Sequence, residues 1–122
     1  MDERQLSSLA TGIGLVFGSA FGTLVGVVLG TELFSAASYG TGGGIVVGAL
    51  VGRLLSANRG EDDFRVRVIG GAATVGLLVG VAVGTVGAWA VDAPLSNGAG
   101  LGAGVGLVHG LVVGTLVFAA VE

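Results

Sequence analysis

The chain has 122 residues, of which 52% are hydrophobic and only 11% are charged, and it carries a formal net charge of -3 at pH 7. Its mean hydropathy of +0.97 lies outside the range of ordinary soluble domains, so we expect the lipid bilayer to be its solvent. Cysteine is absent, which excludes disulfides and thiolate chemistry. No motif for an enzyme, a cofactor, a metal, a small-molecule substrate or a nucleic acid is present, and we predict none of these.

Four uncharged stretches follow one another along the chain, and each is about 20 residues long or longer, the length that a membrane-spanning helix needs. We therefore predict an all-α fold, a four-helix transmembrane bundle forming a single membrane domain over residues 1–122. The predicted spans are residues 6–30, 39–55, 68–91 and 99–121. The second is the shortest, and it crosses the bilayer only if Arg53 extends its side chain to the interface. The alternative is that this segment lies in the interface or re-enters.

The five basic residues, all arginines, lie near the amino terminus or between Arg53 and Arg67. The connections near Glu32 and Asp92 contain no basic residue. Because arginine and lysine concentrate on the cytoplasmic side of membrane proteins, we expect both termini and the central loop to be cytoplasmic.

Seventeen of the 26 glycines recur every fourth residue within these spans. Glycine inside a helix costs up to about 1 kcal/mol relative to alanine, and close backbone packing between helices in lipid is the natural compensation. We therefore interpret the rows as helix-packing residues. They are Gly14, Gly18, Gly22, Gly26, Gly30, Gly40, Gly44, Gly48, Gly52, Gly76, Gly80, Gly84, Gly98, Gly102, Gly106, Gly110 and Gly114.

The chain also matches itself after a shift of 54 positions, the separation between Gly22 and Gly76. This shift aligns the glycine rows without a gap and favours a duplication of one helical hairpin. We predict two tandem hairpins with glycine-zipper packing, an internal repeat over residues 6–57 and a second over residues 66–121. Each contains two spans, so both have the same orientation in the membrane.

The last span has glycine at every second position from Gly98 to Gly106, which makes its first half smooth on two opposite sides. Over about nine residues this run resembles the inner-ring helix of the proteolipid subunits of rotary ATPases, some of which are duplicated hairpins. Those subunits carry an ion on a carboxylate within a span, whereas the acidic residues of this chain lie at span ends or in loops. More broadly, all four spans resemble small glycine-zipper integral membrane proteins, a resemblance that implies architecture and assigns no site.

Two polar residues within the predicted spans are candidates for a functional role. His109 lies near the middle of the last span, where an ionisable residue is a functional hypothesis by default. It is interpreted either as a neutral imidazole that bonds a neighbouring helix or as a proton-sensitive gate. Arg53 is interpreted as an interfacial anchor or as a contact to lipid phosphate.

These patterns predict a small structural or scaffolding membrane protein that self-associates, as a homo-oligomer, or packs in a larger membrane complex through glycine-lined helix faces. The alternative is a homo-oligomeric channel or pore in which His109 lies near the midplane. The first is favoured because residues that could line a pore are sparse and no selectivity motif is present.

Overall fold

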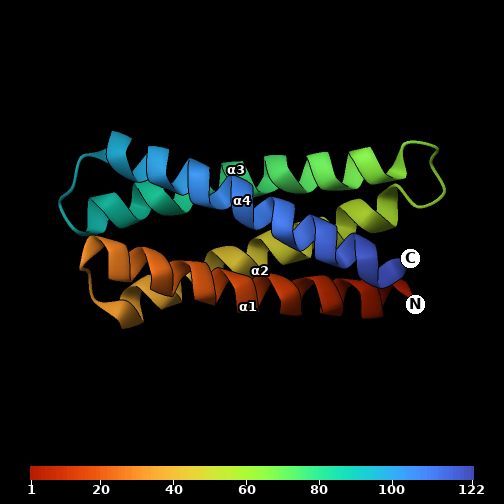
Figure 1. The fold of residues 1–122 in the computed structure, drawn as a ribbon, viewed down its shortest axis with the longest axis horizontal. Helices are drawn as coiled ribbons and strands as arrows, with labels where there is room; N and C mark the ends of the chain where they lie inside the picture. Colours follow the sequence, from red (N-terminus) through yellow and green to blue (C-terminus); the bar gives the residue numbers. More distant parts are fainter.

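The computed structural model describes residues 1–122 as four helices without strands. The helices are α1 (Glu3–Leu29), α2 (Leu33–Ala57), α3 (Phe64–Ala90) and α4 (Leu95–Val121). All four are long and apolar enough to cross a membrane. The chain is therefore an integral membrane protein with an all-α fold, built from the hairpins α1–α2 and α3–α4 (Figure 1).

The second helix is longer than the sequence pattern predicts, because it begins at Leu33 instead of Tyr39. The carboxylate of Glu32 explains the earlier start: it accepts hydrogen bonds of 3.0 Å from the backbone N–H groups of Phe34 and Ser35. A side chain in this capping position satisfies donors that the first helical turn leaves free. At 25 residues α2 exceeds the length needed to span, which argues against a short re-entrant segment.

The two helices of each hairpin meet backbone to backbone at their glycines. In the first hairpin, a Cβ atom added to Gly14 would lie 2.9 Å from Cα of Gly48. In the second, a Cβ atom added to Gly76 would lie 2.7 Å from Cα of Gly110. Real Cβ atoms do not approach other atoms this closely. Only glycine therefore permits these helix separations.

The second hairpin repeats the contacts of the first after a shift of 62 positions, and not after the shift of 54 that the sequence comparison favours. Gly14 faces the carbonyl group of Gly44, and Gly76 faces that of Gly106. The only non-glycine residue with positive φ, Asp92 at 55°, is likewise 62 positions after Gly30 at 63°. The two shifts differ by eight residues, two steps of a four-residue row, so both align glycine with glycine.

The hydrophobic core lies at one end of the bundle. We call this the terminal end, because both chain termini and the loop between α2 and α3 lie there, and the opposite end the loop end (Figure 1). Nine buried residues form the core: Leu6, Ala10, Val47, Val51, Leu55, Val68, Ala72, Val113 and Val117. Eight of them are four pairs related by the shift of 62, such as Leu6 with Val68 and Ala10 with Ala72. The two hairpins are thus joined symmetrically over the terminal half.

Candidate functional site: a cleft between the hairpins

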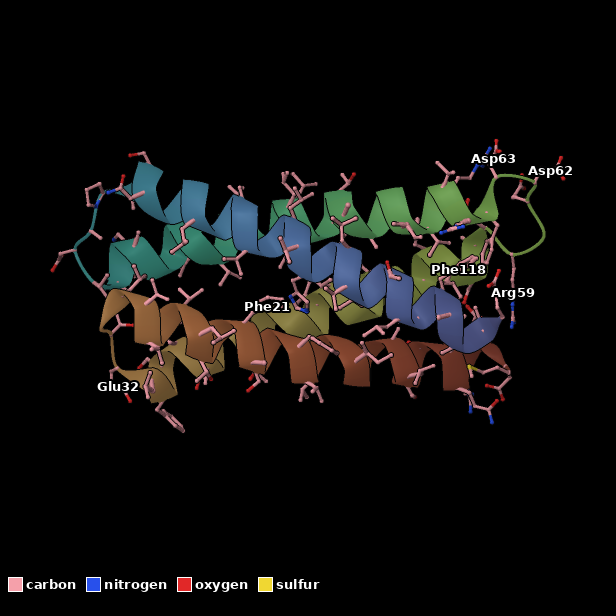
Figure 2. All side chains as sticks on the ribbon, viewed as in Figure 1. Phe21, Glu32, Arg59, Asp62, Asp63 and Phe118 are labelled. Atoms are coloured by element: carbon pink, nitrogen blue, oxygen red, sulfur yellow. The ribbon has the colours of Figure 1, made fainter.

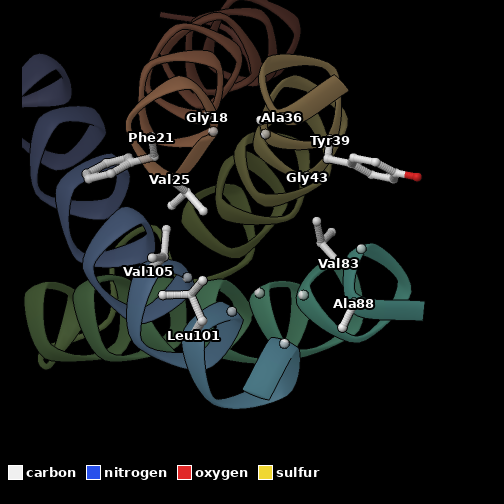
Figure 3. A pocket seen from close by; sticks show the side chains of 18 of the residues that line it. Gly18, Phe21, Val25, Ala36, Tyr39, Gly43, Val83, Ala88, Leu101 and Val105 are labelled. Carbon is white, nitrogen blue, oxygen red and sulfur yellow. The ribbon is translucent and has the colours of Figure 1, made fainter. Parts of the chain in front are cut away.

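A cleft of about 640 Å³ separates the two hairpins over the loop half of the bundle. All four helices line it, and both hairpins present their glycine rows to it, including Gly22 and Gly80. In Figure 3 the side chains of Phe21, Val25 and Val105 lie to one side of the space. The volume falls within the range typical of small-molecule sites.

Polar groups of the cleft concentrate at its mouth, at the loop end. They are Thr31, Glu32, Ser35, Tyr39 and Asn97, and Glu32 is the only charged residue in the lining. Figure 2 shows Glu32 at the loop end, whereas Arg59, Asp62 and Asp63 lie at the terminal end. The space between mouth and floor is therefore apolar and free of formal charge.

The carboxylate of Glu32 is engaged within its own helix. It accepts hydrogen bonds from the hydroxyl of Ser35 and from the backbone N–H groups of Ser35 and Phe34. These bonds, the Ser35 hydroxyl first, lower the pKa of the exposed Glu32 carboxyl below its usual value. Glu32 therefore acts as a helix cap, and its charge stays at the mouth.

His109 lies at the floor of the cleft, on α4. Its side chain is 6% exposed, its Nε2 atom is buried without a hydrogen bond of normal geometry, and the polar group that the imidazole faces is the backbone carbonyl of Gly14 on α1. The ring of Phe21, on α1, packs against the imidazole with ring centroids 5.6 Å apart and planes tilted by 41°. His109 is the only buried polar side chain of the protein.

Position 109 is where the symmetry of the core is broken. The shift of 62 pairs His109 with Val47, which is buried in the core and also lines the cleft. A buried polar atom without a partner costs about 1–3 kcal/mol, whereas a valine in the same place costs nothing of this kind. Histidine at this position therefore lowers stability unless another group bonds it.

Most of the predicted helix-packing glycines lie at contacts within the hairpins, although not all of these contacts are glycine to glycine. A Cβ atom on Gly26 would lie 2.7 Å from Cβ of Ala36, and one on Gly114 would lie 2.6 Å from Cβ of Ala72. Gly30 differs from the rest, since no atom lies within 4 Å of its Cβ position. It ends α1 in the left-handed conformation, so its role is that of a helix cap.

A second set of glycines is open. The helical glycines with no atom within 4 Å of the Cβ position are Gly100 and Gly104 on α4, Gly42 on α2, Gly12 on α1, and Gly70 and Gly87 on α3. The alternate-glycine pattern identifies the first two, whereas Gly42 lies outside the predicted set. It is related to Gly104 by the shift of 62, which is the signal that would have identified it.

Arg53 lies exposed one turn before the end of α2, at the terminal end. No carboxylate pairs with it, and the one ion pair of the protein, Arg67 with Glu61 at 4.0 Å, is elsewhere. Arg53 and His109 therefore belong to different ends of the molecule.

The comparisons with known proteins give no functional lead. No family model matches the chain, no curated protein matches it, and no solved structure matches it. Function is therefore inferred from the cleft and the open helix surfaces alone.

Proposed function

We propose that this protein is a small structural component of the membrane, which self-associates or packs within a larger membrane assembly through the open glycine surface of α4. The observation that carries the proposal is that Gly100 and Gly104 are exposed with open space beside them. The neighbouring Gly102 and Gly106 are instead closed against α3. One helix thus has one occupied and one free glycine surface.

The energetic argument rests on the cost of glycine in a helix. Close packing against α3 compensates Gly102 and Gly106, whereas nothing in the monomer compensates Gly100 and Gly104, each of which costs up to about 1 kcal/mol relative to alanine. Their four-residue spacing is that of the small-xxx-small contacts that join helices in lipid. A partner helix on this surface would supply the missing contacts.

The orientation belongs to the same proposal. The arginines lie at the terminal end, in the amino-terminal segment and between residues 53 and 67. The loops at the other end contain none. On the positive-inside rule, the terminal end faces the cytoplasm and the cleft opens toward the opposite side.

Substitution of the open glycine tests the association. Gly104→Leu should lower the oligomer fraction measured by native mass spectrometry in mild detergent, because its side chain would separate the helices. Gly12→Leu is the matched control, since Gly12 is also exposed with nothing within 4 Å. A monomeric wild-type protein without a co-purifying membrane partner, or equal oligomer fractions for both variants, would contradict the proposal.

A channel is the second candidate function, favoured by a cleft that reaches from the loop end to His109. Against a path through a single bundle, the core around Val113 and Val117 closes its terminal half, so a channel would have to be homo-oligomeric. Ion flux into liposomes that His109→Ala abolishes would support the channel, and absence of flux would exclude it.

A further inference from the structure

The cleft between the hairpins has the properties of a ligand site, independently of any association through α4. We propose that it binds a neutral lipophilic molecule whose ring carries a hydroxyl or carbonyl oxygen, and that this oxygen hydrogen-bonds to His109. Four properties of the cleft carry the proposal: its charge, its walls, its floor and the depth of that floor.

The absence of charge selects a neutral ligand. Of the residues that line the cleft, Glu32 alone is charged, and it lies at the mouth. A charged group placed near the floor would lose its hydration without gaining a counter-charge. The walls themselves are valine, leucine, alanine and glycine, which favour a lipophilic molecule.

The walls favour a ring over a flexible chain. Glycine rows from both hairpins, such as Gly40 to Gly44 and Gly80 to Gly84, bring backbone instead of side chains to the cleft. Such surfaces are smooth and allow close approach of a planar group. Near the floor, Phe21 adds an aromatic ring beside His109, and aromatic rings pack well against one another.

The floor offers a hydrogen-bonding group to an oxygen atom. Nε2 of His109 is buried without a partner, and the equivalent position of the first hairpin holds Val47. An apolar ligand would gain nothing from exchanging that valine for histidine. A hydroxyl or carbonyl oxygen would supply the missing hydrogen bond, since the torsion about Cβ–Cγ is broad and a rotation of the imidazole turns a nitrogen toward the cleft.

The depth of the floor also suits a lipophilic ligand. His109 lies 14 residues after Leu95, so at 1.5 Å per residue it is about 20 Å below the start of α4. This depth is within the hydrocarbon region, where lipophilic molecules concentrate.

The experiment uses para-decylphenol as the probe and decylbenzene, which has the same ring and chain without the oxygen, as the control. The protein is placed in lipid nanodiscs with its imidazole labelled with ¹⁵N. Because the chain has one histidine, the imidazole nitrogen signals report on His109 alone. Para-decylphenol should shift a nitrogen signal in a saturable way, and decylbenzene should not.

Two variants separate a specific site from a merely apolar space. Because His109→Val has no imidazole signal, binding is compared for all variants by the excess of probe retained on protein-containing over empty nanodiscs. His109→Val, which copies the first hairpin, should weaken binding of para-decylphenol by roughly tenfold, the worth of one hydrogen bond, and leave that of decylbenzene unchanged. The double variant Val47→His with His109→Val returns an imidazole to the floor from the other hairpin, and it should restore binding.

Several outcomes would overturn the proposal. Equal binding of the two probes would show that the oxygen is not recognised. Unchanged binding by His109→Val would remove His109 from the site. A double variant that keeps its helical circular dichroism but shows no difference between the probes would also contradict the proposal, and none of these results depends on the oligomeric state.

Discussion

Two residues with positive φ end corresponding helices, and they differ in how well they suit that conformation. Gly30 follows α1 with φ of 63°, and Asp92 lies just beyond α3 with φ of 55°. Glycine adopts the left-handed region without steric cost, whereas other residues pay for it through their Cβ atom. The two hairpins therefore have the same turn geometry, which glycine adopts without strain in the first hairpin and aspartate adopts with strain in the second.

This difference predicts opposite effects of two substitutions. Asp92→Gly should stabilise the protein by about 0.5 kcal/mol, because it removes a strained Cβ atom, and Gly30→Ala should destabilise it by about 1 kcal/mol. Thermal unfolding in detergent, followed by circular dichroism, measures both. A destabilising Asp92→Gly would mean that the Asp92 side chain has a role that outweighs the strain.

The cap formed by Glu32 predicts local acid sensitivity. Because the folded-state pKa of Glu32 lies below its ordinary value of 4.5, the cap contributes fully above that value and is lost as the pH falls through the lowered pKa. Hydrogen exchange at the N–H groups of Phe34 and Ser35 should therefore accelerate in acid beyond the intrinsic pH effect. Glu32→Gln should remove the extra acceleration, and its persistence in that variant would assign it to another group.

Neighbouring glycines of one helix differ in function because they face different surroundings. Gly106 faces α3, where an added Cβ atom would lie 2.8 Å from Cα of Gly80, whereas Gly104 has open space beside it. Helical periodicity places the two glycines on different sides of α4, although only one residue lies between them. Contact, and not the residue type, decides what each glycine contributes.

A matched pair of alanine substitutions tests this difference. Gly106→Ala should destabilise the protein by about 1–3 kcal/mol, because the backbones must move apart. Gly104→Ala should be neutral in the monomer or stabilising by up to about 1 kcal/mol, since alanine is the better helix former. Unfolding by a denaturing detergent compares them, and equal effects would mean that the packed row contributes no specific contact.

At the scale of the whole molecule, two hairpins are joined at the terminal end and apart at the loop end. The core residues lie in the terminal half, and the cleft occupies the loop half. Fewer buried apolar contacts imply lower local stability. The loop end is therefore the part of the bundle whose geometry a ligand can change most readily.

Distances between paired spin labels can measure this asymmetry, and the absence of native cysteine makes the labelling specific. Cysteines at Leu33 and Leu95 report on the loop end, and cysteines at Ala57 and Ala119 report on the terminal end. The loop-end distribution should be broader and should narrow when para-decylphenol binds. Distributions of equal width would show that the loop end is no more variable than the terminal end, against the expected difference in local stability.

Much of the architecture follows from the sequence alone. The distribution of charge marks four spans, because a charged side chain is costly in hydrocarbon, and the four-residue glycine rows place close contacts along the helices. The same regularity conceals the register: shifts of 54 and 62 both superpose glycines, and only the contacts of Gly14 and Gly76, together with the turns at Gly30 and Asp92, select the second.

Composition, span number and the presence of a packed glycine surface were determined by the sequence, because hydrophobicity and steric size are properties of each residue. The tertiary structure decided which glycines are closed and where the hairpins separate. It also decided that His109 packs against Phe21, at the position that Val47 occupies in the first hairpin. These features depend on contacts between segments that are distant in the sequence. A glycine pattern that repeats every four residues is compatible with several registers of helix pairing, and local preferences do not distinguish between them.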